Sequence, residues 1–187
     1  MRSAIIFDLD GTLADTLDDI TSAANVLLAA IGRPSVTAEV MRGLIGEGLP
    51  VLVRRMSGIE DADVIADLVE RYQPAYTARM LDKTRLYPGV EATLDALAAA
   101  DVPMSVLSNK PDVYTVPICD ALLSRWPFMR CCGHTDGGLR KPDPTKAIEL
   151  AAAMGRTVRD TIFVGDSTVD IETARAAGMR SVAVTWG

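Results

Sequence analysis

The chain has 187 residues, of which 49% are hydrophobic and 5% aromatic, and it carries a formal net charge of -6 at pH 7. This length and apolar content are enough for one domain with a buried core and a modest inserted domain. The negative charge excludes a general electrostatic attraction to nucleic acid or to an anionic membrane, so we expect neither as a partner. Any anionic ligand must therefore be held by a local site.

No apolar stretch reaches the roughly 18 residues that a membrane-spanning helix needs, and the N-terminal residues do not have the pattern of a signal peptide. The three cysteines, Cys119, Cys131 and Cys132, are odd in number and two are adjacent, which is typical of reduced thiols. We therefore expect a cytoplasmic protein. Cys131 and Cys132 could bind a metal together with His134, but we interpret them as core residues because a zinc site needs a fourth, well-spaced ligand.

The first apolar run, residues 3–7, predicts a buried strand that leads into Asp8, Asp10 and Gly11. Residues i and i+2 of an extended chain share a face, so the two carboxylates can converge just past the strand, and glycine permits a tight turn there. Such a pair favours a cation. It is typical of a nucleophilic carboxylate, Asp8, with Asp10 as general acid/base and Mg²⁺ beside them, although a polar turn after an ordinary strand has the same pattern.

The next segment shows only helical periodicity. Thr16 and Asp19 indicate a helix start of the capping-box type, and Pro74 is expected to kink or end the last long helix. A helical stretch of about 65 residues is too long for a simple crossover between strands, which predicts an inserted cap. The expected domains are a catalytic core of residues 1–13 and 83–187 and a helical cap of residues 14–82.

From residue 83 onward, helical and strand patterns alternate. Such alternation predicts a parallel sheet with helices on both faces, so we expect an α/β fold with a Rossmann-like core and an inserted helical cap domain. The expected strands are residues 3–7, 102–108, 128–132, 161–165 and 181–185, and the helices between the last four begin near residues 112, 145 and 168.

Polar side chains follow the second and third of these strands. Ligands of an open parallel sheet bind beyond the carboxyl ends of its strands. The Ser108 hydroxyl and the Asn109 backbone N–H could hold a phosphoryl oxygen there, or Ser108 could simply cap a helix. Lys141, in a loop rich in glycine and proline, could neutralise a phosphate and Asp8, or it could be an exposed surface lysine.

A second pair of acids follows the fourth strand. Asp166 lies at the strand end and Asp170 one helical turn later on the same side, although Asp166 or Ser167 could serve only as a helix cap. Asp8, Asp10, Asp166 and Asp170 would repel one another and a phosphate strongly, and Lys141 alone cannot offset that charge. We therefore predict that these four acids form a Mg²⁺ site next to Lys141.

The segment Asp8-Leu-Asp10-Gly-Thr12, together with Ser108, Lys141 and Gly165-Asp166-x-x-x-Asp170, resembles the four motifs of the haloacid dehalogenase superfamily. Residues 44–49, 141–144 and 174–179 are most similar to the phosphoglycolate phosphatase branch, and the resemblance covers essentially the whole chain. It implies that Asp8 attacks phosphorus and forms an aspartyl-phosphate, and that Asp10 protonates the leaving alcohol and later activates water. Mg²⁺ would be held by Asp8, the Asp10 carbonyl and Asp166, with Asp170 behind them.

The same resemblance implies a Mg²⁺-dependent phosphatase for 2-phosphoglycolate or a similar small phosphorylated acid, acting as a monomer or homodimer. The alternatives are a phosphatase for other phosphomonoesters such as nucleotide or sugar phosphates, a phosphotransferase like β-phosphoglucomutase, and an inactive binding module that keeps the fold. Arg42, Arg54 and Arg55 flank a glycine-rich cap loop and could meet a substrate carboxylate, or they could be exposed helix residues. The expected substrate-binding residues are Thr12, Ser108, Asn109, Gly46, Glu47 and Gly48.

Overall fold

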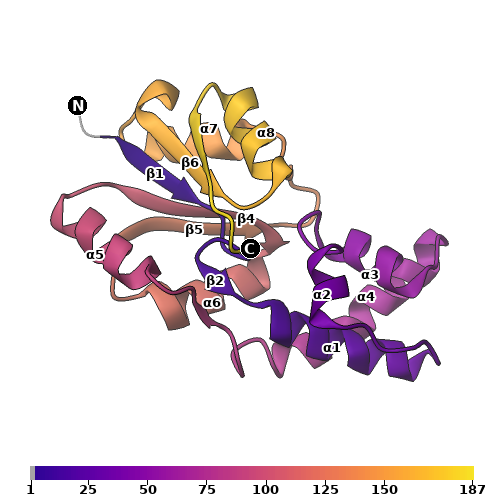
Figure 1. Ribbon diagram of the computed structural model, residues 1–187. Coiled ribbons are helices and arrows are strands. Elements are labelled where there is room, and N and C mark those ends of the chain that lie inside the picture. Colours follow the sequence, from indigo (N-terminus) through magenta and orange to yellow (C-terminus); the bar gives the residue numbers. More distant parts are fainter. Residues whose placement is uncertain (1–2) are drawn as a thin grey trace. The chain divides into compact units, whose positions relative to one another are not determined.

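The computed structural model describes residues 3–187, and its chain divides into two compact units (Figure 1). Unit 1 comprises Met1–Asp15 and Leu86–Gly187, and unit 2 comprises Thr16–Arg85. The assignment of the inserted unit as a substrate cap stays a prediction. Within residues 3–187, no helix is both long enough and apolar enough to cross a bilayer.

Unit 1 is built on a five-stranded sheet in which every neighbouring pair of strands is parallel. β1 lies at the centre, with Ala4 and Ile6 completely buried, because helices cover both faces of the sheet. The strand order is β5-β4-β1-β6-β7. The strands are β1 Ala4–Phe7, β4 Met104–Pro111, β5 Phe128–His134, β6 Thr161–Gly165 and β7 Arg180–Ala183.

Two apolar clusters, one on each face, hold the sheet to its helices. Phe7 packs with Leu94 and Ile118 in one cluster, and Ile6 packs with Leu150 in the other. Successive residues of β1 therefore point to opposite cores, as the period of an extended chain requires. The structure confirms the predicted α/β fold. The helices are α5 Val90–Ala99, α6 Asp112–Leu123, α7 Thr145–Ala153 and α8 Thr168–Ala177, with a short 3-10 helix η1 Val158–Asp160.

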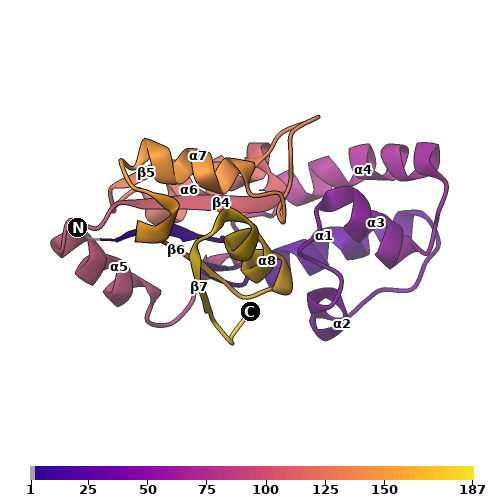
Figure 2. The same cartoon turned by 90° about the horizontal axis from the view of Figure 1, so that it is seen from above.

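Unit 2 is helical, as predicted, and Figure 2 shows α1, α3 and α4 lying against one another. The chain passes between the units through two short strands that pair with each other, β2 Ala14–Asp15 and β3 Arg85–Leu86, which the sequence analysis did not predict. The helices of unit 2 are α1 Leu17–Ala30, α2 Ala38–Arg42, α3 Leu49–Ser57 and α4 Ala62–Thr77.

The structure tests two expectations for the helices of unit 2. α4 does not end at Pro74 but continues to Thr77, while a kink at Pro74 stays a prediction. Thr16 makes no side-chain cap, and the Asp19 carboxylate instead accepts hydrogen bonds from the backbone N–H groups of Lys83 and Thr84 and from the Thr84 hydroxyl. Asp19 is only 1% exposed, so these bonds to a segment distant in sequence satisfy a buried charge in place of the local cap.

Candidate active site

The turn after β1 places the first acid at the carboxyl end of the central strand. Asp8 is buried, its backbone N–H donates to the Val164 carbonyl (2.9 Å), and its Oδ1 accepts from the Leu9 N–H (2.7 Å). Gly11 has φ +79°, and a Cβ there would lie 2.5 Å from Asp166 Oδ2. Only glycine fits this position without strain, because the turn both takes a left-handed conformation and approaches a carboxylate closely.

Lys141 lies between two of the predicted acids. Its Nζ is 2.9 Å from Asp8 Oδ1 and 2.6 Å from Asp170 Oδ1, and its side chain is 3% exposed. Asn109 fixes the backbone of this loop, because its side-chain amide accepts from the Lys141 N–H (2.8 Å) and donates to the Lys141 carbonyl (3.0 Å). Lys141 is therefore a buried ammonium group paired with two carboxylates, and not a surface lysine.

The turn from β6 into α8 brings in the second acid pair. Ser167 caps α8 in a capping box with Asp170, so the capping alternative holds for Ser167 and not for Asp166. The other carboxylate oxygen of Asp170 accepts from Lys141, and the role of Asp170 in the active site stays a prediction. One carboxylate oxygen from each of Asp8, Asp166 and Asp170 lies within 4.8 Å of the others. We call these three residues the acid cluster.

Burial and charge make the acid cluster electrostatically unfavourable without a cation. Burial raises the pKa of Asp8 to about 7 in spite of Lys141, and burial also raises the pKa of Asp166. Burial alone would lower the pKa of Lys141, but its attraction to Asp8 and Asp170 outweighs that effect and raises it. Three carboxylates face one ammonium group, and a set of oxygen ligands of this kind fits a hard divalent cation.

The carboxylate of Asp10 is not part of the acid cluster. It binds Lys110, whose Nζ lies 3.1 Å from Asp10 Oδ1 and 2.9 Å from Asp10 Oδ2. No role was predicted for Lys110, and only Lys141 was set against the four acids. The signal was available, since Lys110 lies two residues after Ser108 in the same strand and so shares its face.

Thr12 contacts one of these acids directly, and Ser108 lies in the same strand as Lys110. The Thr12 hydroxyl donates to Asp166 Oδ1 (2.9 Å), so it orients a carboxylate of the acid cluster. Ser108 is 5% exposed, and its Oγ accepts from the Lys110 backbone N–H at 3.3 Å. The predicted roles of both residues in substrate binding stay predictions.

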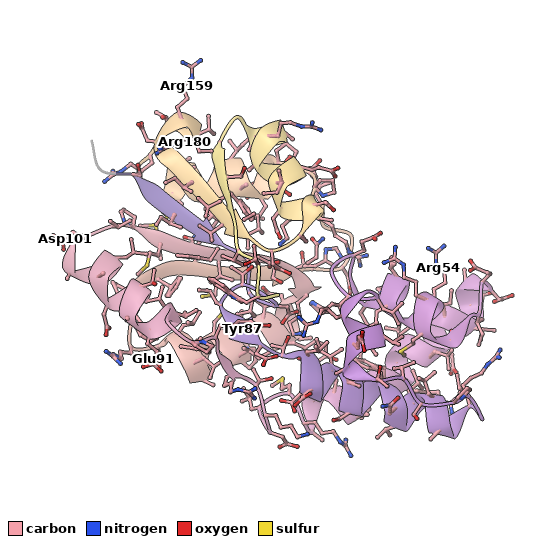
Figure 3. All side chains as sticks on the ribbon, in the orientation of Figure 1. Arg54, Tyr87, Glu91, Asp101, Arg159 and Arg180 are labelled. Atoms are coloured by element: carbon pink, nitrogen blue, oxygen red, sulfur yellow. The ribbon has the colours of Figure 1, made fainter. Side chains whose placement is uncertain are left out.

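The predicted cap-loop residues belong to unit 2. Gly46, Glu47 and Gly48 lie between α2 and α3, and Glu47 forms an ion pair with Arg55 across 2.6 Å. Arg54 pairs with Glu60 at 3.5 Å. Arg54 points outward from the helices in Figure 3. The proposed contact of this loop or its arginines with substrate stays a prediction.

Comparison with known proteins supports the same interpretation. The sequence profile of the haloacid dehalogenase-like hydrolases matches residues 5–184. The phosphoglycolate phosphatase of Agrobacterium fabrum strain C58 is 38% identical over 97% of this chain and 80% of its own length. That of Pseudomonas syringae pv. syringae strain B728a is 37% identical over 98% of this chain and 69% of its own length.

A solved structure agrees over the whole chain. The crystal structure of a predicted phosphoglycolate phosphatase from Haemophilus somnus 129PT has a TM-score of 0.91 and 30% identity, and the match covers 100% of this chain and 86% of that one. The protein belongs to the haloacid dehalogenase-like hydrolase family. Within that family, its relatives and its structure indicate that it is a phosphatase.

Proposed function

We propose that this phosphatase hydrolyses 2-phosphoglycolate or a similar small phosphorylated acid, in a Mg²⁺-dependent reaction that passes through an aspartyl-phosphate on Asp8. One observation carries the chemistry: Asp8 lies at the end of the central strand, 2.9 Å from the Lys141 ammonium and within the acid cluster. The substrate is proposed from the phosphoglycolate phosphatases of Agrobacterium fabrum and Pseudomonas syringae, to which the chain is 38% and 37% identical.

In the first step, a carboxylate oxygen of Asp8 attacks phosphorus, and the bond between phosphorus and the alcohol oxygen breaks. The proton that the departing alkoxide needs comes from Asp10, two residues further along the turn. In the second step, Asp10 takes a proton from water, the oxygen of that water attacks the aspartyl-phosphate, and inorganic phosphate leaves as the Asp8 carboxylate is restored.

In this proposal Lys141, Lys110 and a metal ion together offset the negative charges of the carboxylates and the phosphoryl group. Lys141 contacts Asp8 directly, so it lowers the repulsion between the nucleophile and an anionic phosphoryl group. A Mg²⁺ ion held by Asp8, Asp166 and the Asp10 carbonyl, with Asp170 behind them, would polarise the phosphoryl oxygens. Lys110 neutralises the Asp10 carboxylate, which lies outside the acid cluster.

The test is a kinetic comparison of wild-type protein and Asp8→Asn on para-nitrophenyl phosphate and 2-phosphoglycolate, with MgCl₂ and with EDTA. An amide is nearly isosteric with a carboxylate but a poor nucleophile, so we expect turnover to fall by more than about 10²-fold while the melting curve is kept. Undiminished turnover in Asp8→Asn would contradict the nucleophile assignment.

Substrate preference is tested separately. In wild-type protein, 2-phosphoglycolate should have a higher kcat/KM than neutral phosphomonoesters and sugar phosphates. A preference for a sugar or nucleotide phosphate, or transfer of phosphate between sugar positions, would replace the proposed substrate and leave the phosphatase chemistry in place.

A further inference from the structure

Trp186 lies beside the turn that carries the catalytic acids, although it belongs to none of the four motifs. Its indole Nε1–H donates to the Thr12 carbonyl across 3.1 Å. The backbone reaches this position directly from the sheet, because the Val184 N–H donates to the Gly165 carbonyl (2.9 Å) just after β7. A residue far along the chain thus supports the backbone of the first motif.

The neighbouring residue packs against the same turn. A Cβ built on Gly187 would lie 2.5 Å from both Asp166 Oδ2 and the Gly11 carbonyl oxygen. The segment formed by Trp186 and Gly187 is therefore in close contact with one acid of the cluster and with the turn that precedes Thr12. Such proximity explains how a change at Trp186 can reach the acid cluster without any direct contact with substrate.

A second contact fixes the indole ring. The rings of Trp186 and Tyr87 have centroids 6.2 Å apart and planes inclined at 45°, and the Tyr87 backbone N–H donates to the Leu13 carbonyl (3.1 Å). Figure 3 shows Tyr87 next to the C-terminal trace, shown in yellow. Trp186 is still 46% exposed, so its position is set by these two contacts more than by burial in a core.

We propose that Trp186 is a positioning residue of the active site: it holds the Thr12 carbonyl, which fixes the turn from which the Thr12 hydroxyl orients the Asp166 carboxylate. The last link is the 2.9 Å hydrogen bond from Thr12 Oγ1 to Asp166 Oδ1. The turn needs such support because Gly11, with φ +79°, has much conformational freedom. This inference rests on the proposed role of Asp166 as a ligand of a divalent cation.

The test is Trp186→Phe, which keeps an aromatic ring beside Tyr87 but removes the indole N–H together with the five-membered ring that carries it. The variant loses the hydrogen bond to the Thr12 carbonyl, which affects the Asp166 carboxylate only through Thr12. We therefore expect Mg²⁺ binding to weaken about 3- to 10-fold. Affinity is measured from the rise in melting temperature with MgCl₂ in the presence of inorganic phosphate, which requires no turnover. Unchanged affinity in Trp186→Phe would overturn the proposal.

The matched control is the other tryptophan of the chain. Trp126 also donates one hydrogen bond from Nε1, to Asp95 Oδ1 (2.8 Å). Trp126 precedes the amino end of β5, whereas Asp8 and Asp166 follow the carboxyl ends of β1 and β6. Trp126→Phe should therefore leave the Mg²⁺ affinity unchanged, whatever it does to the melting temperature without metal. Equal weakening in both variants would show a general loss of stability and would contradict a specific role for Trp186.

A double-mutant cycle distinguishes positioning from simple packing. If Trp186 acts through the Thr12 hydroxyl, then Trp186→Phe should weaken Mg²⁺ binding little further in a Thr12→Val background. Independent, additive effects would overturn the proposed route. If the melting temperature of wild-type protein does not respond to MgCl₂, the proposed Mg²⁺ dependence fails. If wild-type protein responds and Trp186→Phe responds equally, only the proposed role of Trp186 fails.

Discussion

Lys110→Met tests whether Asp10, the proposed general acid/base, depends on its lysine partner. The Lys110 side chain is 5% exposed and that of Asp10 20%, and the Lys110 Nζ contacts both carboxylate oxygens. Methionine has a similar length and fits a buried position, but it provides no hydrogen-bond donor. The Asp10 carboxylate then loses the contacts that hold it in one orientation.

The size of the effect follows from those contacts. A hydrogen bond to a charged group contributes about 1.5–3 kcal/mol, and about 1.4 kcal/mol corresponds to a tenfold change in rate. If this energy serves to hold Asp10 in its catalytic orientation, kcat should fall about 10- to 100-fold. KM for 2-phosphoglycolate should change little, since Lys110 acts through Asp10 and not on the substrate in this interpretation.

Rapid-mixing kinetics with para-nitrophenyl phosphate gives a sharper measurement. The aryl leaving group needs little protonation, so Lys110→Met should still release a burst of nitrophenol as Asp8 is phosphorylated, followed by a slow steady state in which water activation is impaired. Lys146→Met is the control, because Lys146 forms an exposed ion pair with Glu149 (2.6 Å) on α7. A wild-type kcat in Lys110→Met, or a rise in KM alone, would refute the positioning of Asp10 by Lys110.

Two further predictions concern stability. The pKa of Asp8 is 3.8 in its ordinary state and about 7 in the folded protein. Between these two pH values, Asp8 binds more protons in the folded than in the unfolded protein, so the metal-free protein becomes less stable as the pH rises. Added MgCl₂ should therefore raise the melting temperature more at pH 8 than at pH 5, and an equal rise at both would argue against cation binding by Asp8. Asp19→Ala should lower the free energy of unfolding by about 2–4 kcal/mol in urea titrations, because it leaves buried donors of Lys83 and Thr84 without their acceptor. Asp18→Ala changes an exposed neighbour and should lower the free energy of unfolding by less than about 1 kcal/mol. Equal losses in the two variants would contradict a stabilising role of the hydrogen bonds from Lys83 and Thr84 to Asp19.

The parallel sheet was predictable from the sequence because the periods of strands and helices are local properties. The strand starting at Ala4 and the helices starting at Asp112 and Thr145 lie where the apolar pattern predicted them. Parallel strands that alternate with helices bring their carboxyl ends to one edge, so Asp8, Lys141 and Asp166 could be expected in one place. The short pairing of β2 with β3 was not predictable, since two-residue strands have no period.

Other features depend on contacts between residues far apart in the chain. Local pattern assigned Asp19 to a helix cap, whereas the folded chain uses it to bind the segment at Lys83 and Thr84. Lys110 was left without a role because its position two residues after Ser108 indicates which face it shares but not which carboxylate it will meet. In both cases a buried charge takes the partner that satisfies it best, and sequence distance does not limit that choice.

The sequence by itself determined the α/β class and the identity of the acids at the strand ends, because both follow from local periodicity and from the geometry of a parallel sheet. Only the tertiary structure decided how those charges are paired. It separates the Asp10 carboxylate, bound to Lys110, from the acid cluster that shares Lys141, and it brings Trp186 to the Thr12 carbonyl. Electrostatic and hydrogen-bond partners depend on distances of a few ångströms between segments that only folding brings together.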